Sequence, residues 1–132
     1  MKLTKMPAGK GSIEHSTPDY VVALVQEALE DAKAREIEII DVRGKTSITD
    51  FMVVASGNST RHVKTLAESV VTKGKQAGLE ILGVEGEGDA EWVLVDMAVV
   101  LIHVMLPRTR AFYNLESLWS VEGPAVAGEI VV

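Results

Sequence analysis

The sequence predicts a single α/β domain in which a mixed sheet of about five strands is covered by helices. Apolar residues recur at steps of three and four in two long segments, as in helices that bury one face. Short β-branched and apolar runs lie between and after these segments, as expected of strands. The resulting order is helix, two strands, helix, three strands, helix. Such an order favours a sheet with helices packed on it.

The first helix is expected to begin beside Thr17. The threonine side chain can accept from the first free N–H groups, Pro18 suits the first helical position, and Asp19 favours the positive end of the helix dipole. The helix ends near Arg35, and its single apolar stripe indicates a surface helix over a core. The stripe consists of Val21, Leu24, Val25, Ala28, Leu29 and Ala32.

Two strands and a second helix follow. The strands are expected over residues 37–42 and 51–55, where β-branched and apolar side chains dominate. The helix spans roughly residues 60–77, because Ser59-Thr60 can cap its start and Gly78 suits the left-handed position after its end. Its buried stripe is formed by Val63, Leu66, Ala67, Val70 and Val71.

Three further strands are expected over residues 79–84, 91–96 and 99–106. Met97-Ala98 is short enough to join the last two as a tight hairpin. Neither residue favours the positive φ of a two-residue hairpin turn, so a slightly wider turn is the alternative. Pro107 ends the last strand because proline cannot donate to a sheet.

The last helix is expected after this proline, with Thr109 as a candidate cap. Its apolar face would consist of Phe112, Leu115, Leu118 and Trp119. Residues 1–16 lack apolar periodicity and are expected to be a flexible leader, and residues 121–132 an irregular tail. The domain itself is therefore expected over residues 17–120.

The composition narrows the classes of function. The chain has no cysteine, which excludes disulfides, thiolate catalysis and cysteine-based zinc sites. A formal net charge of -6 disfavours broad binding to phosphate backbones and favours a basic protein partner. The longest apolar stretch, from Met97 to Leu106, is too short to cross a bilayer as a helix. We therefore expect a cytoplasmic protein without a membrane span.

The residues that could support catalysis are few. Asp89 and Glu91 stand two apart before a strand and could hold magnesium for nucleotidyl transfer, but a solvated loop explains them better. The turn from Ser56 to His62 could hold an anion, yet it lacks a Walker or dinucleotide glycine pattern, and an ordinary turn is favoured. The histidines lack metal-site spacing, and His103 lacks a nucleophile motif. We expect no metal and no cofactor.

The fourth and fifth strands present two different faces, because side chains alternate along a strand. One face carries only β-branched residues and is the natural core: Val93, Val95, Val100, Ile102 and Val104. The mixed face carries Trp92, Leu94 and Asp96, then Val99, Leu101, His103 and Met105. An exposed Trp92 would suit a protein-binding anchor. Equally, a helix could cover this face and make Trp92 part of a core.

Several short segments follow one another in a distinctive order and spacing between about Asp19 and Trp119. They are Ser47–Phe51, Ser59–Val63, Gly83–Gly86, Trp92–Asp96, Ile102–Met105 and Arg110–Trp119. Each is weak alone, but the combination is highly specific. Through these segments the chain resembles the ribosomal silencing factor (Iojap-like) family.

The resemblance implies a non-enzymatic translation repressor. Such a protein would bind the large ribosomal subunit through ribosomal protein fourteen, where the small subunit would land, and block joining by steric exclusion. The resemblance also implies a fold similar to nucleotidyltransferases, a homodimer when free, and no sequence-specific nucleic acid binding. The chain departs from the family pattern at Ala98-Val99, where a Gly-Asp pair ordinarily stands.

Trp92 is the expected docking anchor. The full set of expected protein-binding residues is Trp92, Asp89, Glu91, Leu94, Asp96 and His103. Family motifs also include Arg61, His62, Arg110 and Tyr113; for the last two an internal role is open, holding the last helix against the sheet. Two alternatives are a magnesium-dependent nucleotidyltransferase, although the Gly-Ser turn of those enzymes is reversed here, and a homodimeric protein-binding scaffold.

Overall fold

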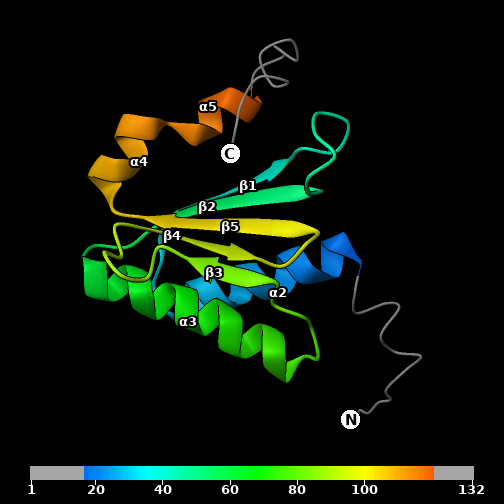
Figure 1. The fold of residues 1–132 in the computed structure, drawn as a ribbon, viewed down its shortest axis with the longest axis horizontal. Helices are drawn as coiled ribbons and strands as arrows, with labels where there is room; N and C mark the ends of the chain where they lie inside the picture. Colours follow the sequence, from blue (N-terminus) through cyan, green and yellow to red (C-terminus); the bar gives the residue numbers. More distant parts are fainter. Residues whose placement is uncertain (1–16, 121–132) are drawn as a thin grey trace.

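A five-stranded sheet runs through the middle of the molecule (Figure 1) in the computed structural model, which describes residues 17–120. The strands are β1 (Arg35–Asp41), β2 (Phe51–Ser56), β3 (Gly83–Glu85), β4 (Trp92–Asp96) and β5 (Val100–Met105). Their order in the sheet is β1-β2-β5-β4-β3. β2 and β5 are parallel, and the other neighbouring pairs are antiparallel. The predicted mixed α/β sheet is therefore confirmed.

Helices lie on both faces of this sheet. One face is covered by α2 (Pro18–Asp31) and α3 (Thr60–Gln76), which lie side by side (Figure 1). The short helices α4 (Pro107–Tyr113) and α5 (Leu115–Ser120) follow β5 and lie over the opposite face (Figure 1). The expected leader and tail lie outside the described residues.

The main core lies between the sheet and the long helices. The five β-branched residues predicted as the core face of β4 and β5 are all 0% exposed. The helix stripes face them, with Val25 and Leu29 of α2 and Val63 and Leu66 of α3 fully buried. Both predicted helices and their buried stripes are confirmed, because the spacing of apolar residues indicates which side of a helix is buried. The first helix ends earlier than predicted, at Asp31 and not near Arg35, which belongs to β1.

The predicted caps of the long helices are also confirmed. The Thr17 hydroxyl accepts from the Tyr20 N–H across 3.3 Å, and the Ser59 hydroxyl accepts from the His62 N–H across 3.1 Å. After α3, Gly78 adopts a φ of +82°, a left-handed conformation that glycine enters without steric cost.

The third strand is shorter and later than predicted. Residues 79–84 were expected to pair, but β3 covers only Gly83–Glu85. The Leu79 N–H instead donates to the Gly74 carbonyl of α3, and the Leu79 and Ile81 side chains pack against the main core. The apolar residues of this segment are therefore buried beneath the edge of the sheet and do not pair with a neighbouring strand.

The prediction of a single helix after Pro107 is wrong, because the helix is interrupted at Asn114. Asn114 has a φ of +50° and separates α4 from α5. Thr109 is not the cap: Leu106 occupies the N-cap position of α4 without a side-chain hydrogen bond. Phe112, predicted on the buried face, is 80% exposed, whereas Leu115 is buried as expected. The side chains of Leu118 and Trp119 lie outside the described residues.

The hairpin between β4 and β5 has the wider of the two turns considered. β4 ends at Asp96 and β5 begins at Val100, which leaves three loop residues. Ala98 takes the left-handed position with a φ of +68°, and its N–H donates to the Asp96 carboxylate across 2.9 Å. Asp96 therefore serves the turn as an internal acceptor.

Candidate functional site

The second face of the sheet is only partly covered. Beneath α5 lies a small second core that contains Met52, Val54, Met105 and Leu115, with Trp92 packed at its border. On this face the β5 side chains are buried, whereas Trp92, Leu94 and Asp96 of β4 remain partly exposed. Trp92 therefore combines the two alternatives left open by the sequence, since it is part core and part surface.

Three aromatic residues form a surface that we call the aromatic patch: Trp92, Phe112 and Tyr113. The Trp92 and Tyr113 ring centroids are 4.7 Å apart, and the Phe112 ring meets Tyr113 edge-on at 4.9 Å. Phe112 is 80% exposed and Tyr113 50% exposed. Large rigid side chains exposed together are typical of sites that bind another protein.

A cavity of about 380 Å³ adjoins the aromatic patch and brings the acidic residues to it. Asp89 and Glu91 line it together with Trp92 and Tyr113, and both carboxylates belong to exposed residues. The Glu91 carboxylate lies 4.0 Å from the exposed Arg108 guanidinium, a contact too loose and solvated to neutralise the site. The result is an aromatic surface with an acidic border.

The loop beside this cavity depends on one glycine. Gly86 has a φ of +92°, and a Cβ at this position would lie 2.2 Å from the Trp92 carbonyl oxygen. Only glycine permits both the left-handed turn and this close approach. The turn thus places residues 87–89 directly beside the start of β4.

His103 lies beneath Trp92 and is 3% exposed. The Trp92 Nε1–H donates to His103 Nδ1 across 2.9 Å. Burial lowers the pKa of His103 to about 4, so the imidazole is neutral at neutral pH. His103 was expected to be a binding residue, but it lies beneath the Trp92 indole and offers almost no surface of its own.

A buried polar cluster ties α4 and α5 to the sheet. Arg110 is 7% exposed, and its guanidinium donates to the Ser56 hydroxyl across 2.9 Å and to the Glu116 carboxylate across 2.8 Å. Tyr113, one turn after Arg110, rests on Trp92. The internal role considered is therefore confirmed for Arg110, whereas Tyr113 is half exposed and contacts the sheet through Trp92. Ser56 is 2% exposed, so its hydroxyl faces this cluster and not solvent.

His62 and Arg61 lie at the start of α3. His62 Nδ1 accepts from the Asn58 N–H, and Nε2 lies 2.9 Å from the Ala32 carbonyl oxygen, which requires the proton on Nε2. The imidazole thus joins the end of α2 to the start of α3. Arg61 is exposed and lines a neighbouring cavity with Lys64 and Asp89.

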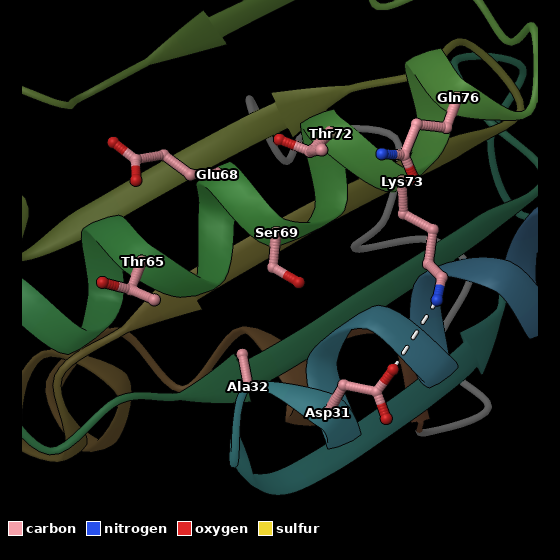
Figure 2. A pocket seen from close by; sticks show the side chains of 8 residues that line it. All are labelled: Asp31, Ala32, Thr65, Glu68, Ser69, Thr72, Lys73 and Gln76. Atoms are coloured by element: carbon pink, nitrogen blue, oxygen red, sulfur yellow. Dashed lines mark ion pairs between the residues drawn. The ribbon is translucent and has the colours of Figure 1, made fainter.

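A second cavity, of about 420 Å³, lies on the helical side of the molecule between α2 and α3. Figure 2 shows Thr65, Ser69 and Lys73 of α3 facing the end of α2. The Lys73 ammonium lies 3.6 Å from the Asp31 carboxylate, and the Ser69 hydroxyl donates to the Ala28 carbonyl. These contacts join the two helices. None of the predicted site residues lines this second cavity.

The geometry gives little support to metal-assisted catalysis. Ala90 has a φ of +59° between Asp89 and Glu91, so the two carboxylates do not belong to one continuous strand. Within residues 17–120 no group of three or more His, Asp or Glu side chains is placed to hold a metal ion.

The amino-acid sequence from residue 14 to residue 130 matches the model of one protein family, described as ribosomal silencing factor during starvation. The chain belongs to this family. Ribosomal silencing factor RsfS of Chromobacterium violaceum is 48% identical over 104 residues, which cover 79% of this chain and 85% of that protein. The corresponding protein of Haemophilus influenzae is 40% identical and is covered to 98%.

Relatives of this silencing-factor family extend to mitochondria. A mouse protein named mitochondrial assembly of ribosomal large subunit protein 1 is 32% identical over 114 residues, which cover 84% of this chain and 50% of that protein.

None of the helices in the described part of our chain is long and apolar enough to cross a membrane.

Solved structures confirm the fold. A crystal structure of a Chromobacterium violaceum protein has a TM-score of 0.78 at 45% identity and covers 82% of this chain and 90% of that one. A Bacillus halodurans structure has a TM-score of 0.71 at 34% identity and covers 76% and 94%. The likeness to nucleotidyltransferases stays a prediction.

The candidate site differs in two respects from the set of residues predicted from the sequence. Leu94 and Asp96 share a face with Trp92, but Asp96 lies four residues along the strand, about 13 Å from it, and does not reach the cavity. Phe112 was missed, because helical periodicity assigned it to a buried face. The sequence signal that could have identified Phe112 is its position directly before Tyr113, in a segment that resembles the family.

Proposed function

We propose that this chain binds the large ribosomal subunit and represses translation by keeping the small subunit from joining. The observation that carries the proposal is the aromatic patch with its acidic border, on a chain that belongs to the ribosomal silencing factor family. Steric exclusion requires a firm contact surface and no catalytic turnover. The protein is therefore proposed to act without a metal or cofactor.

The proposed partner on the subunit is ribosomal protein fourteen. The chain carries a formal net charge of -6, and exposed Asp89 and Glu91 border the aromatic patch. A basic protein surface complements this arrangement, since opposite charges steer association and aromatic anchors supply affinity. The name of the mouse relative, which refers to assembly of the large ribosomal subunit, supports the choice of subunit.

The proposed contact residues fall into two groups. Trp92, Phe112 and Tyr113 would insert apolar surface into the partner, and Asp89 and Glu91 would pair with basic side chains around them. Leu94 and Asp96 would extend the contact along β4, where both are partly exposed. Away from the ribosome, we propose a cytoplasmic homodimer.

Co-sedimentation tests this function. Purified protein is mixed with isolated large subunits at near-physiological salt and centrifuged through a sucrose cushion, after which small subunits are added and joined ribosomes are quantified. The expected result is protein in the large-subunit pellet and fewer joined ribosomes. The function is overturned by two outcomes, either no co-sedimentation or binding that leaves joining unchanged.

Two matched variants locate the contact. Trp92→Ala should weaken binding by at least ~2 kcal/mol, because aromatic anchors dominate interface energetics. Leu82→Ala removes another large apolar side chain, 55% exposed and next to β3, and should bind as the wild type does. Equal binding by both variants would remove Trp92 as the anchor.

A further inference from the structure

The contact between Trp92 and His103 links a surface residue to a buried one. The indole Nε1–H donates to Nδ1 of the imidazole across 2.9 Å, and the ring centroids lie 5.8 Å apart. Tyr113 packs on the indole from α4 with a centroid distance of 4.7 Å. The indole is therefore held by a directed hydrogen bond from the sheet and by a ring contact from the helix.

The hydrogen bond determines the protonation state of the imidazole. A nitrogen that accepts from the indole cannot carry a proton, so the single proton of neutral His103 lies on Nε2. Nε2 is buried and has no hydrogen-bond partner among the residues the structure describes. A buried donor without a partner is costly, and an apolar side chain of similar size would avoid that cost. Packing alone therefore does not account for a histidine at this position.

We propose that His103 is a positioning residue that holds the Trp92 indole in the orientation required for docking, through the acceptor nitrogen of its neutral imidazole. This inference rests on the proposed function, because it assigns a purpose to the orientation of the docking anchor. An indole fixed before binding loses less side-chain freedom on association than a mobile one. His103 thus acts on affinity without touching the partner.

The surroundings of His103 keep it neutral. Its cross-strand neighbours are Val54 of β2 and Leu94 of β4, both apolar. The titratable groups on the same face of the sheet or on the helices over it are Arg35, Glu38, Glu85, Asp96, Arg108, Arg110, Tyr113 and Glu116. Arg110 and Glu116 pair with each other, and burial is the cause of the lowered pKa of His103.

Two substitutions separate the hydrogen bond from packing. His103→Asn places a carbonyl oxygen near the position of Nδ1 and keeps an acceptor, whereas His103→Leu fills similar space without one. Both remove the titratable group, so any difference between them reports the acceptor. Backbone ¹H–¹⁵N spectra of the two variants establish that the fold is intact.

The first readout is hydrogen exchange of the Trp92 indole N–H, measured by NMR on the full chain and assigned with Trp92→Phe. We expect slow exchange in the wild type and His103→Asn, and roughly tenfold faster exchange in His103→Leu. Equally slow exchange in all three proteins would overturn the proposal. So would fast exchange in His103→Asn with an intact fold, because the acceptor would then be irrelevant.

The second readout is affinity for isolated large subunits. His103→Leu should bind roughly fivefold more weakly than the wild type, with His103→Asn close to the wild type. Trp92→Phe keeps a ring but loses the N–H, so His103→Leu should add no further loss in that background. An indole that loosens without any change in affinity would overturn the docking role.

The proposed function and the positioning role of His103 can fail separately. Absence of subunit binding by the wild type would overturn the proposed function. The indole exchange rates would still decide whether His103 holds Trp92, because they are measured on the free protein.

Discussion

Arg110 on α4 donates to the hydroxyl of Ser56 at the end of β2 across 2.9 Å, although 54 residues separate them in the chain. The same guanidinium donates to Glu116 of α5 across 2.8 Å. One buried cation therefore joins the sheet to both short helices. Because Tyr113 follows one turn later and packs on Trp92, this cluster also sets where the aromatic patch lies.

Arg110→Met is expected to lower the free energy of unfolding by about 2–3 kcal/mol, because it leaves the Glu116 carboxylate largely buried without its cation. Adding Glu116→Leu should recover most of the loss, since an apolar pair of similar volume is tolerated where a buried ion pair stood. Urea denaturation measures both. Arg108→Met, at a side chain that is 77% exposed, serves as the control, and an equal effect there would contradict the assignment.

His103 makes the stability depend on pH. The folded-state pKa is about 4, below the ordinary value of 6.5, so the unfolded chain binds the proton more readily. The stability contributed by the neutral imidazole is complete above pH 6.5 and is lost as the pH falls towards 4. The maximum loss is on the order of 3 kcal/mol. The difference in unfolding free energy between wild type and His103→Asn should therefore change between pH 7 and pH 4.5, and a constant difference would refute the lowered pKa.

The exposed aromatic residues should contribute to binding and not to folding. Phe112→Ala should change the free energy of unfolding by less than ~0.5 kcal/mol, because the side chain is 80% exposed. Its affinity for large subunits should fall by about 1–2 kcal/mol if the aromatic patch is the contact surface. Thermal melts and a binding titration measure the two quantities. A stability loss with unchanged affinity would reverse the assignment.

The acidic border should act mainly on the rate of association. Asp89→Asn with Glu91→Gln is expected to slow association about threefold at low salt and to weaken its salt dependence, since both charges lie at the rim of the contact. Stopped-flow light scattering measures these rates. Asp19→Asn with Glu80→Gln makes the same change in net charge at exposed positions elsewhere, and an equal slowing there would show that net charge alone is responsible.

Ala98→Gly should stabilise the fold by about 0.5–1 kcal/mol. Ala98 has a φ of +68°, a conformation that strains an L side chain and that glycine adopts freely. Gly78→Ala is the opposite case, because Gly78 has a φ of +82° with open space around it, and it should destabilise by about 1 kcal/mol. Urea denaturation of both variants tests the sign, and a loss of stability in Ala98→Gly would show that the turn is not strained.

The parts of the fold that sequence reasoning predicted are those with a local signal. The spacing of Val21, Val25 and Leu29 reports which side of α2 is buried, and the alternation of Val93 and Val95 does the same for β4. Caps at Thr17 and Ser59 follow from hydroxyls beside free N–H groups. Each of these depends on neighbours within about one turn of chain.

The errors arise from contacts between distant segments and from a local break that periodicity does not report, the left-handed Asn114. Phe112 has the right spacing for a buried helix face, yet the hydrogen bond from Arg110 to Ser56 holds the Arg110 side of α4 against the sheet and leaves Phe112 in solvent. Leu79 has the composition of a strand but packs on the main core instead. The alternation along β4 correctly assigns Trp92 to the face opposite the main core, but how far its side chain is shielded from solvent depends on the position of α4.

The sequence by itself determined the class of fold, the helices and core strands, and a resemblance to the family to which the chain belongs, because periodicity and motif order are properties of the chain alone. Only the tertiary structure decided which side chains meet: that Tyr113 rests on Trp92, that His103 accepts from its indole, and that Asp89 and Glu91 border the same cavity. The physical reason is that the aromatic patch and its acidic border are assembled from β4, α4 and a loop, and their relative placement follows from burial and hydrogen bonds between residues far apart in sequence.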